Sequence, residues 1–155
     1  MFHSHKINLI ILILISIVFG WQLFKPGFFS MHDDLQVMRL YEMDRCYQNG
    51  QIPCRWSPDM GAGYGQPMFN FYSVLPYNLG ELFHLLGFSF IDTVKVLFFL
   101  ALLGSGVFSY LFLSEMVIAP AALVGSLVYL ITPYRAVDIF VRGAMSETWA
   151  LTLMP

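Results

Sequence analysis

Charged side chains are scarce in this sequence, since only 12% of its 155 residues are Asp, Glu, Lys or Arg. A typical soluble domain carries about 25%. Lys and Arg together number 8 and the formal net charge is −2, so the chain lacks the basic surface that general nucleic-acid binding needs. What the sequence does contain is apolar: 57% of it is hydrophobic, in long uncharged runs, and the mean hydropathy is +0.66. These features exclude a disordered chain, a coiled coil and an ordinary cytosolic domain, and they predict an all-α membrane protein.

Three apolar runs are candidates for membrane-spanning helices, which need about 20 largely apolar residues. They cover residues 7–24, 94–113 and 117–133. The first is followed by no small-residue cleavage site, so we interpret it as an uncleaved anchor and not as a signal peptide. A last apolar run, 148–155, is too short to span, and we therefore expect the sequence to be the N-terminal fragment of a larger multi-pass protein.

The stretch 69–88 is apolar on average but contains Glu81, whose charge would cost at least a few kcal/mol at mid-bilayer. Tyr72, Tyr77 and Phe83 are typical of an interfacial helix. We predict a re-entrant or interfacial helix that returns to the side it entered. The first loop (30–68) and the polar segment 134–147 then face one compartment; if 69–88 crosses, they face opposite compartments. The distribution of Lys and Arg leaves the orientation of the chain open.

The first loop is predicted to contain an interfacial helix over 30–50. Ser30 and Asp33 have the spacing of a capping box, and Asn49-Gly50 is a natural stop. Arg39 and Glu42 are expected to pair at i, i+3.

Two readings are open for the adjacent acids Asp33 and Asp34. Acids commonly cap helix starts, but two carboxylates at a membrane boundary can also supply a general base or a ligand for a divalent cation. Cys46 and Cys54 lie in the same loop and can form a disulfide if it faces an oxidising compartment. Arg55 is either an interface anchor or a contact for a lipid phosphate.

Arg135, Asp138 and Arg142 recur at i, i+3 and i+7, so they share one face of a helix. This pattern is either a ladder of salt bridges or a pair of guanidinium groups that binds a lipid phosphate.

An ordered set of motifs resembles the N-terminal part of a bacterial multi-pass membrane family related to the C-type (GT-C) glycosyltransferases. Some members carry the label "6-pyruvoyl-tetrahydropterin synthase-related membrane protein". The matching motifs are His32-Asp33, Gly50-Gln51-Ile52-Pro53, Arg55-Trp56-Ser57-Pro58-Asp59, the run from Gly61 to Tyr72, Leu75-Pro76-Tyr77, Thr132-Pro133-Tyr134-Arg135, Asp138, and the run from Arg142 to Glu147.

The resemblance implies a GT-C-like helical bundle in the bacterial plasma membrane that transfers sugar from a polyprenyl-phosphate-linked donor. Asp33, with Asp34 as its neighbour, would be the catalytic acid of the first extracytoplasmic loop. Asp138 and Glu147 would be second-loop acids, and Arg135 and Arg142, with Arg55, would contact the donor phosphate. A divalent cation (Mg²⁺ or Mn²⁺) would be held by Asp33 and Asp138.

The alternative from another class is a non-enzymatic membrane protein, such as a lipid flippase or a transporter subunit. It would use the arginines to bind an anionic lipid headgroup and would need no carboxylate base.

Overall fold

The structure, a computed structural model, describes residues 2–155, with side chains from residue 5 onward. Within that range it is all-helical without strands, and its one sheet-like pairing is an isolated bridge between Ser57 and Gln66. The elements in chain order are α1 (Phe2–Phe19), η1 (Trp21–Phe24), α2 (Gln36–Gln48), η2 (Met68–Asn70), α3 (Leu75–Leu85), α4 (Phe90–Ser114), α5 (Ala119–Ile131), α6 (Pro133–Val137), η3 (Asp138–Arg142) and α7 (Met145–Leu153).

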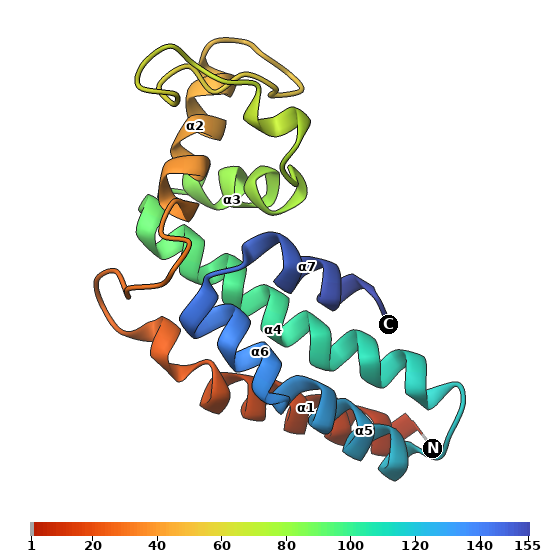
Figure 1. Ribbon diagram of the computed structural model, residues 1–155. Coiled ribbons are helices and arrows are strands. Elements are labelled where there is room, and N and C mark those ends of the chain that lie inside the picture. Colours follow the sequence, from red (N-terminus) through yellow and green to blue (C-terminus); the bar gives the residue numbers. More distant parts are fainter. Residues whose placement is uncertain (1) are drawn as a thin grey trace.

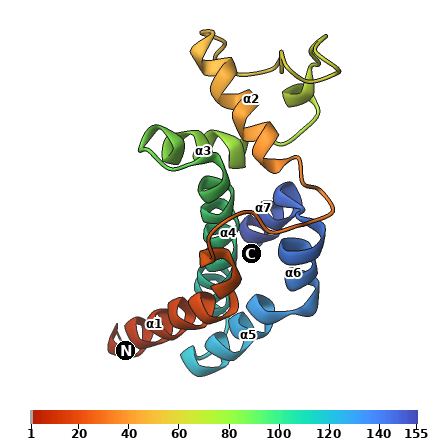
Figure 2. The ribbon, with the colours of Figure 1, turned by 90° about the vertical axis from the view of Figure 1, so that its left-hand side faces the viewer.

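The helices form a bundle with a smaller cap at one end (Figure 1). The long helix α4 runs through the bundle, where it packs against α1, α5 and α7, and it also contacts α2 and α3 of the cap. Figure 2 shows α3 lying across the end of α4 while α2 rises away from the bundle. The main core follows this arrangement, since it joins Leu40 of α2, Tyr77 of α3 and Phe98 of α4.

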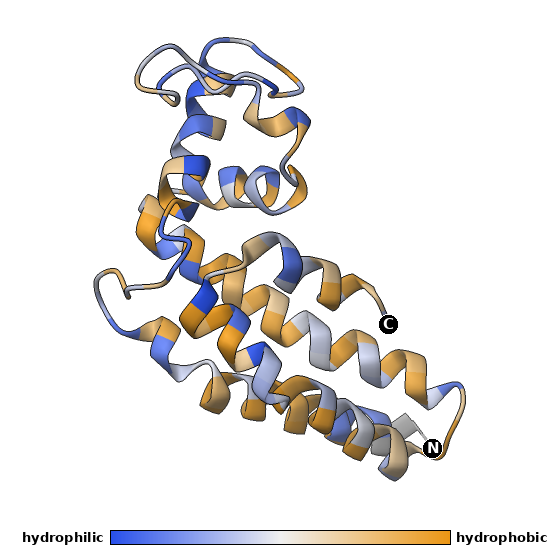
Figure 3. Ribbon diagram, in the orientation of Figure 1, coloured by the Kyte–Doolittle hydropathy of each residue, from blue (hydrophilic) through white to orange (hydrophobic). Residues whose placement is uncertain are grey.

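Among the described residues, two helical runs are long and apolar enough to cross a membrane: Phe90–Ser114 and Ala119–Arg142. Apolar residues line the bundle, whereas the cap is more polar (Figure 3). Large apolar side chains are exposed on the outer faces of the bundle, among them Ile10, Leu14, Val18, Phe112, Val124 and Val128. Such a surface is typical of contact with lipid or a partner. The all-helical class is confirmed, and the two runs suggest membrane association.

The boundaries of the outer two expected spans were wrong. The first, 7–24, divides after Phe19 into α1 and the 3-10 helix η1, and its described apolar part, His5–Phe19, is shorter than a full span. The third, 117–133, continues to Arg142, with one extended residue at Thr132 (ψ 133°) because the residue before a proline disfavours the helical region. Most of the segment 134–147 therefore belongs to this helical run and is not a separate polar segment.

The predicted capping box at Ser30 and Asp33 was also wrong. Helix α2 begins only at Gln36, its N-cap residue is Leu35, and no side chain caps it. The predicted end is confirmed, because α2 stops at Gln48 and the following Gly50 has φ +73°. The residues before α2 are held by contacts with the far end of the chain, which a local capping signal does not contain.

The stretch 69–88 forms the short helix α3, preceded by the single turn η2. Eleven residues of α-helix extend about 16 Å, roughly half of the hydrocarbon thickness. Tyr77, expected at an interface, is instead fully buried, and Glu81 is only 2% exposed. Both side chains lie on the face that packs against α2 and α4, while Leu82 and Leu85 are exposed.

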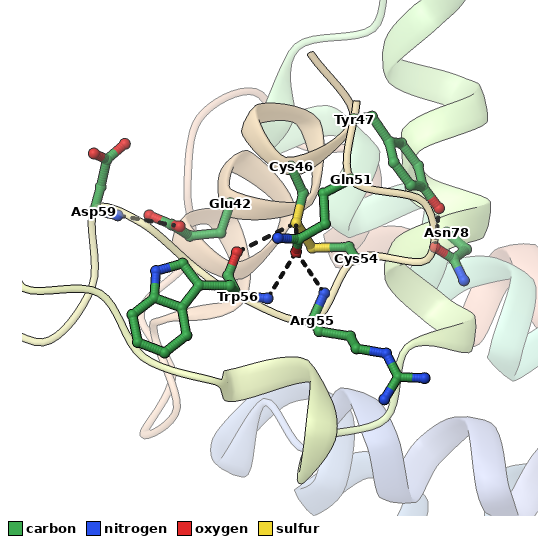
Figure 4. The surroundings of a disulfide bond; sticks show 9 residues. All are labelled: Glu42, Cys46, Tyr47, Gln51, Cys54, Arg55, Trp56, Asp59 and Asn78. Atoms are coloured by element: carbon green, nitrogen blue, oxygen red, sulfur yellow. Dashed lines mark hydrogen bonds between the residues drawn. A yellow bond between two sulfur atoms is a disulfide. The ribbon is translucent and has the colours of Figure 1, made fainter. Parts of the chain in front are cut away.

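Cys46 and Cys54 form a disulfide, which decides the alternative that the sequence left open (Figure 4). The bond ties the second half of α2 to the loop that follows it. Beside it, the Gln51 side-chain oxygen accepts hydrogen bonds from the backbone N–H groups of Arg55 and Trp56, each at 2.8 Å. The cap is therefore closed by a covalent link and by a polar side chain that fixes the loop backbone.

Candidate functional site

The loop after α1 and η1, residues 25–35, is hydrogen-bonded to the end of the helical run Ala119–Arg142. The N–H of His32 donates to the carbonyl of Val141, and the N–H of Asp33 donates to the carbonyl of Arg142, each at 2.9 Å. The last carbonyls of a helix have no partner within the helix, so the loop satisfies two groups that would otherwise remain free. Gly143 ends the run with φ +66°. These contacts bring Asp33 to the polar end of a distant helix.

One oxygen of the Asp33 carboxylate is held by three side chains. Its Oδ2 accepts from Arg39 at 2.7 Å and from Gln36 at 2.9 Å, and it lies 3.3 Å from the Tyr72 hydroxyl. The Arg39 guanidinium also lies over the Tyr72 ring, 4.2 Å from its centroid. The side chain of Asp33 is 30% exposed. All three contacts are made to Oδ2, so Oδ1 remains free to accept a proton from a ligand.

A buried pair behind Asp33 orients the Gln36 amide. Gln36 is fully buried, and its side-chain oxygen accepts from the Tyr77 hydroxyl at 2.5 Å. Burial strongly raises the pKa of Tyr77, so its hydroxyl keeps the proton that it donates. The Gln36 nitrogen is thereby directed to Asp33 and to the Gly143 carbonyl, 2.6 Å away. The Asp33 carboxylate is thus held by Gln36 and Arg39 of α2 and by Tyr72, while the Asp33 backbone N–H is bound to Arg142.

A second cluster of charges surrounds Arg142. Its Nη1 donates to Asp138 at 2.5 Å and to the Tyr134 hydroxyl at 3.1 Å, while Nη2 lies 2.8 Å from a Glu147 oxygen. Tyr134 in turn donates to Glu147. The hydrogen bond from Tyr134, which has the larger effect, and the one from Arg142 lower the pKa of Glu147. One guanidinium is thus paired with two carboxylates. Asp138 and Arg142 bound the π-helical turn η3, a form of helix that is frequent at functional sites.

The two clusters meet at one cavity of about 490 Å³. Its walls come from the loop after α1, the segment before α3, the end of η3 and the start of α7. The lining residues are His32, Asp33, Tyr72, Arg142, Ala144, Ser146 and Glu147. The lining thus combines two carboxylates, one guanidinium group, one imidazole ring and the hydroxyl groups of Tyr72 and Ser146.

The structure distinguishes the two adjacent acids. Asp33 lines the cavity, whereas Asp34 is exposed and makes no salt bridge with the described residues. Asp138 is fully buried behind Arg142 and is not among the lining residues. Glu147 lines the cavity.

The three arginines proposed for phosphate binding have separate positions. Arg142 lines the cavity. Arg135 does not: it is 2% exposed, lies over the Tyr129 ring, and donates to the carbonyls of Thr148 and Leu151, each at 3.2 Å. Arg135 therefore holds α7 in place and does not take part in this cavity. Arg55 lines a different, smaller cavity in the cap.

The expected cation site does not fit the geometry. In the described part of the chain, no three His, Cys, Asp or Glu side chains gather in a way that could hold a metal ion. Asp138 is paired with Arg142, and Asp33 with Arg39. The pair Asp33 and Asp138 is therefore not a set of metal ligands in this arrangement.

Sequence reasoning missed the three residues that hold Asp33, namely Gln36, Arg39 and Tyr72, and it missed Tyr77, which orients Gln36. Arg39 was expected to pair with Glu42, but it pairs with Asp33, and Glu42 faces the loop, where its carboxylate lies 3.4 Å from the Asp59 N–H. The spacing of Asp33, Gln36 and Arg39 at intervals of three was a usable signal.

Comparisons with protein-family models, with curated proteins and with solved structures found no match. A function is therefore inferred from the residues that line the cavity.

Proposed function

We propose that this protein is a GT-C-like glycosyltransferase of the bacterial plasma membrane that uses a polyprenyl-phosphate-linked sugar donor. One observation carries the proposal: Asp33, which has a free carboxylate oxygen, shares a cavity with Arg142 at the end of a helical run of membrane-spanning length. Sugar transfer from a lipid phosphate needs a base and a cation together at membrane depth.

In the proposed reaction, Asp33 Oδ1 accepts the proton of the acceptor hydroxyl. The acceptor oxygen then forms a bond to the anomeric carbon of the sugar, and the bond from that carbon to the lipid phosphate breaks. The leaving phosphate keeps the electron pair of the broken bond. Arg39 and Gln36 act on the other oxygen of Asp33, so they are positioning residues and do not touch the substrate.

Arg142 is the candidate contact for the leaving phosphate. Its two carboxylate partners differ, because Asp138 is buried whereas the Glu147 side chain is 37% exposed. A phosphate that enters the cavity would compete with Glu147, while Asp138 keeps the guanidinium in place. Fork-like contacts between Arg and phosphate oxygens are favourable in energy and geometry.

The disulfide supports a position of the cap outside the cytoplasm. Disulfides persist in oxidising compartments such as the bacterial periplasm and are rare in the cytosol. The bond between Cys46 and Cys54 closes the cap, which stands at the same end of the bundle as the cavity. We therefore infer that the site opens outside the cytoplasm.

The test is transfer of radiolabelled sugar from a panel of polyprenyl-phosphate hexoses by the full-length protein in proteoliposomes. Asp33→Asn should reduce transfer about 10²–10⁴-fold, which is the usual contribution of a general base. The matched control is Asp34→Asn, which removes the adjacent exposed carboxylate and should leave transfer nearly unchanged. Undiminished transfer by Asp33→Asn would refute the assignment. Lipid movement without transfer, insensitive to both substitutions, would favour the non-enzymatic alternative.

A further inference from the structure

A second cavity, of about 280 Å³, lies between η1 with its following loop and the first turns of α4. It is separate from the residues proposed to act on the sugar. The lining residues are Leu23, Phe24, Lys25, Pro26, Asp92, Lys95, Val96 and Phe99. Two lysines and one aspartate are thus the charged residues of a lining that is otherwise apolar.

Lys95 has a buried ammonium group that is not fully used. Its side chain is 7% exposed, and Nζ donates to the carbonyl of Lys25 at 2.6 Å and lies 3.5 Å from an Asp92 oxygen. An ammonium group has three donors, so one remains for a ligand. A buried cation is costly unless it is paired, and Asp92, with a side chain 57% exposed, is a poorly shielded partner.

Lys25 adds an exposed second cation at the rim. Its Nζ lies 5.2 Å from the centre of the Trp21 ring. Trp21 and Phe24 are 58% and 56% exposed, and amphipathic aromatic rings are enriched at the level of lipid headgroups. The cavity also lies at the start of α4, which is one of the two candidate spans. Its apolar walls and its two lysines therefore lie at one end of a candidate span, where lipid headgroups are expected.

We propose that this cavity binds the phosphate of an anionic phospholipid, with Lys25 and Lys95 on the headgroup and the aromatic walls against the first part of an acyl chain. The shared chemistry is a phosphate anion, and the apolar walls favour the lipid over free phosphate. The proposal does not depend on the glycosyltransferase assignment, because none of its residues lines the cavity of Asp33.

The test uses Trp21 as a local reporter. The other two tryptophans are replaced (Trp56→Phe, Trp149→Phe), and the protein is placed in nanodiscs of phosphatidylcholine that contain an equal fraction of either brominated phosphatidylglycerol or brominated phosphatidylcholine. Bromine quenches the fluorescence of a neighbouring tryptophan, so we expect stronger quenching by the anionic lipid. Lys25→Gln should lower that preference about fivefold, since each lysine near an anionic membrane surface contributes about 1 kcal/mol, and Lys25→Arg should retain it.

Lys6→Gln is the matched control, because it removes one exposed lysine near the opposite end of α1. The preference should survive in this variant. Equal quenching by the two lipids would overturn the proposal, as would an equal loss of preference in Lys6→Gln and Lys25→Gln. Displacement of the anionic lipid by millimolar inorganic phosphate would overturn the lipid assignment and identify a site for free phosphate.

Discussion

Replacing Gly143 with alanine tests the contact that brings the two halves of the site together. Gly143 has φ +66°, and a Cβ at this position would overlap the Met31 sulfur, lie 2.7 Å from the Met31 Cγ and lie 3.1 Å from the Asp33 carbonyl oxygen. A left-handed conformation costs an alanine about 1–2 kcal/mol. Overpacking against the buried Met31 side chain costs typically about 1–3 kcal/mol more. We therefore expect Gly143→Ala to lower the free energy of unfolding by about 2–5 kcal/mol.

Gly50 supplies a matched control for the backbone contribution. It has φ +73°, but a Cβ there meets no atom within 4 Å, so Gly50→Ala should cost only the conformational part, about 1–2 kcal/mol. The assay is reversible unfolding in mixed micelles with sodium dodecyl sulfate, followed by tryptophan fluorescence. Adding Met31→Ala to Gly143→Ala should recover part of the loss, because it removes the side-chain overlap. Equal losses in Gly143→Ala and Gly50→Ala would refute the close contact between the loop and the helix end.

Three further predictions concern the cap and the residues that hold Asp33. Burial, and after it the neighbouring Asp44, raises the pKa of Glu81 above its ordinary value of 4.5. The stability that the protonated Glu81 contributes is therefore fully present below pH 4.5 and is lost as the pH rises through the folded-state pKa. Glu81→Gln should stabilise the protein at neutral pH and flatten the dependence of its unfolding free energy on pH. Cys46→Ser should lower the unfolding free energy by about 2–3 kcal/mol, as expected for so short a closed loop; a reductant should have the same effect on the native protein and none on a double variant with Cys54→Ser. Arg39→Gln should lower the unfolding free energy by about 1.5–3 kcal/mol, because it removes a charge-assisted hydrogen bond, and should reduce sugar transfer, whereas Arg39→Lys should lose less of both; unchanged transfer in Arg39→Gln would contradict its positioning role.

Local features of the chain could be predicted because they depend on residues close together in sequence. The apolar run of α4 and the stop of α2 at Asn49-Gly50 follow from composition and turn chemistry. The boundaries of the third span could not be predicted in this way. Pro133 signals a break, but the helix resumes after one extended residue with Pro133 in its first turn, and its polar end is completed by the loop after α1.

The residues of the candidate site could likewise be predicted only in part. The sequence identified Asp33, Arg142 and Glu147 as chemically relevant, and all three line one cavity. It could not choose between Asp33 and Asp34, since adjacent residues of one type have the same local signal. The choice depends on which backbone N–H reaches the Arg142 carbonyl.

The sequence by itself determined that the chain is helical and apolar and that most of its few charges lie in two stretches, 33–59 and 135–147. Only the tertiary structure decided which charges meet. Arg135 and Arg142 have similar sequence surroundings, yet one binds carbonyls of α7 in the interior and the other faces the cavity. The physical reason is that periodicity fixes the face of a helix on which a side chain lies, whereas its partners are fixed by elements that pack there from distant parts of the chain.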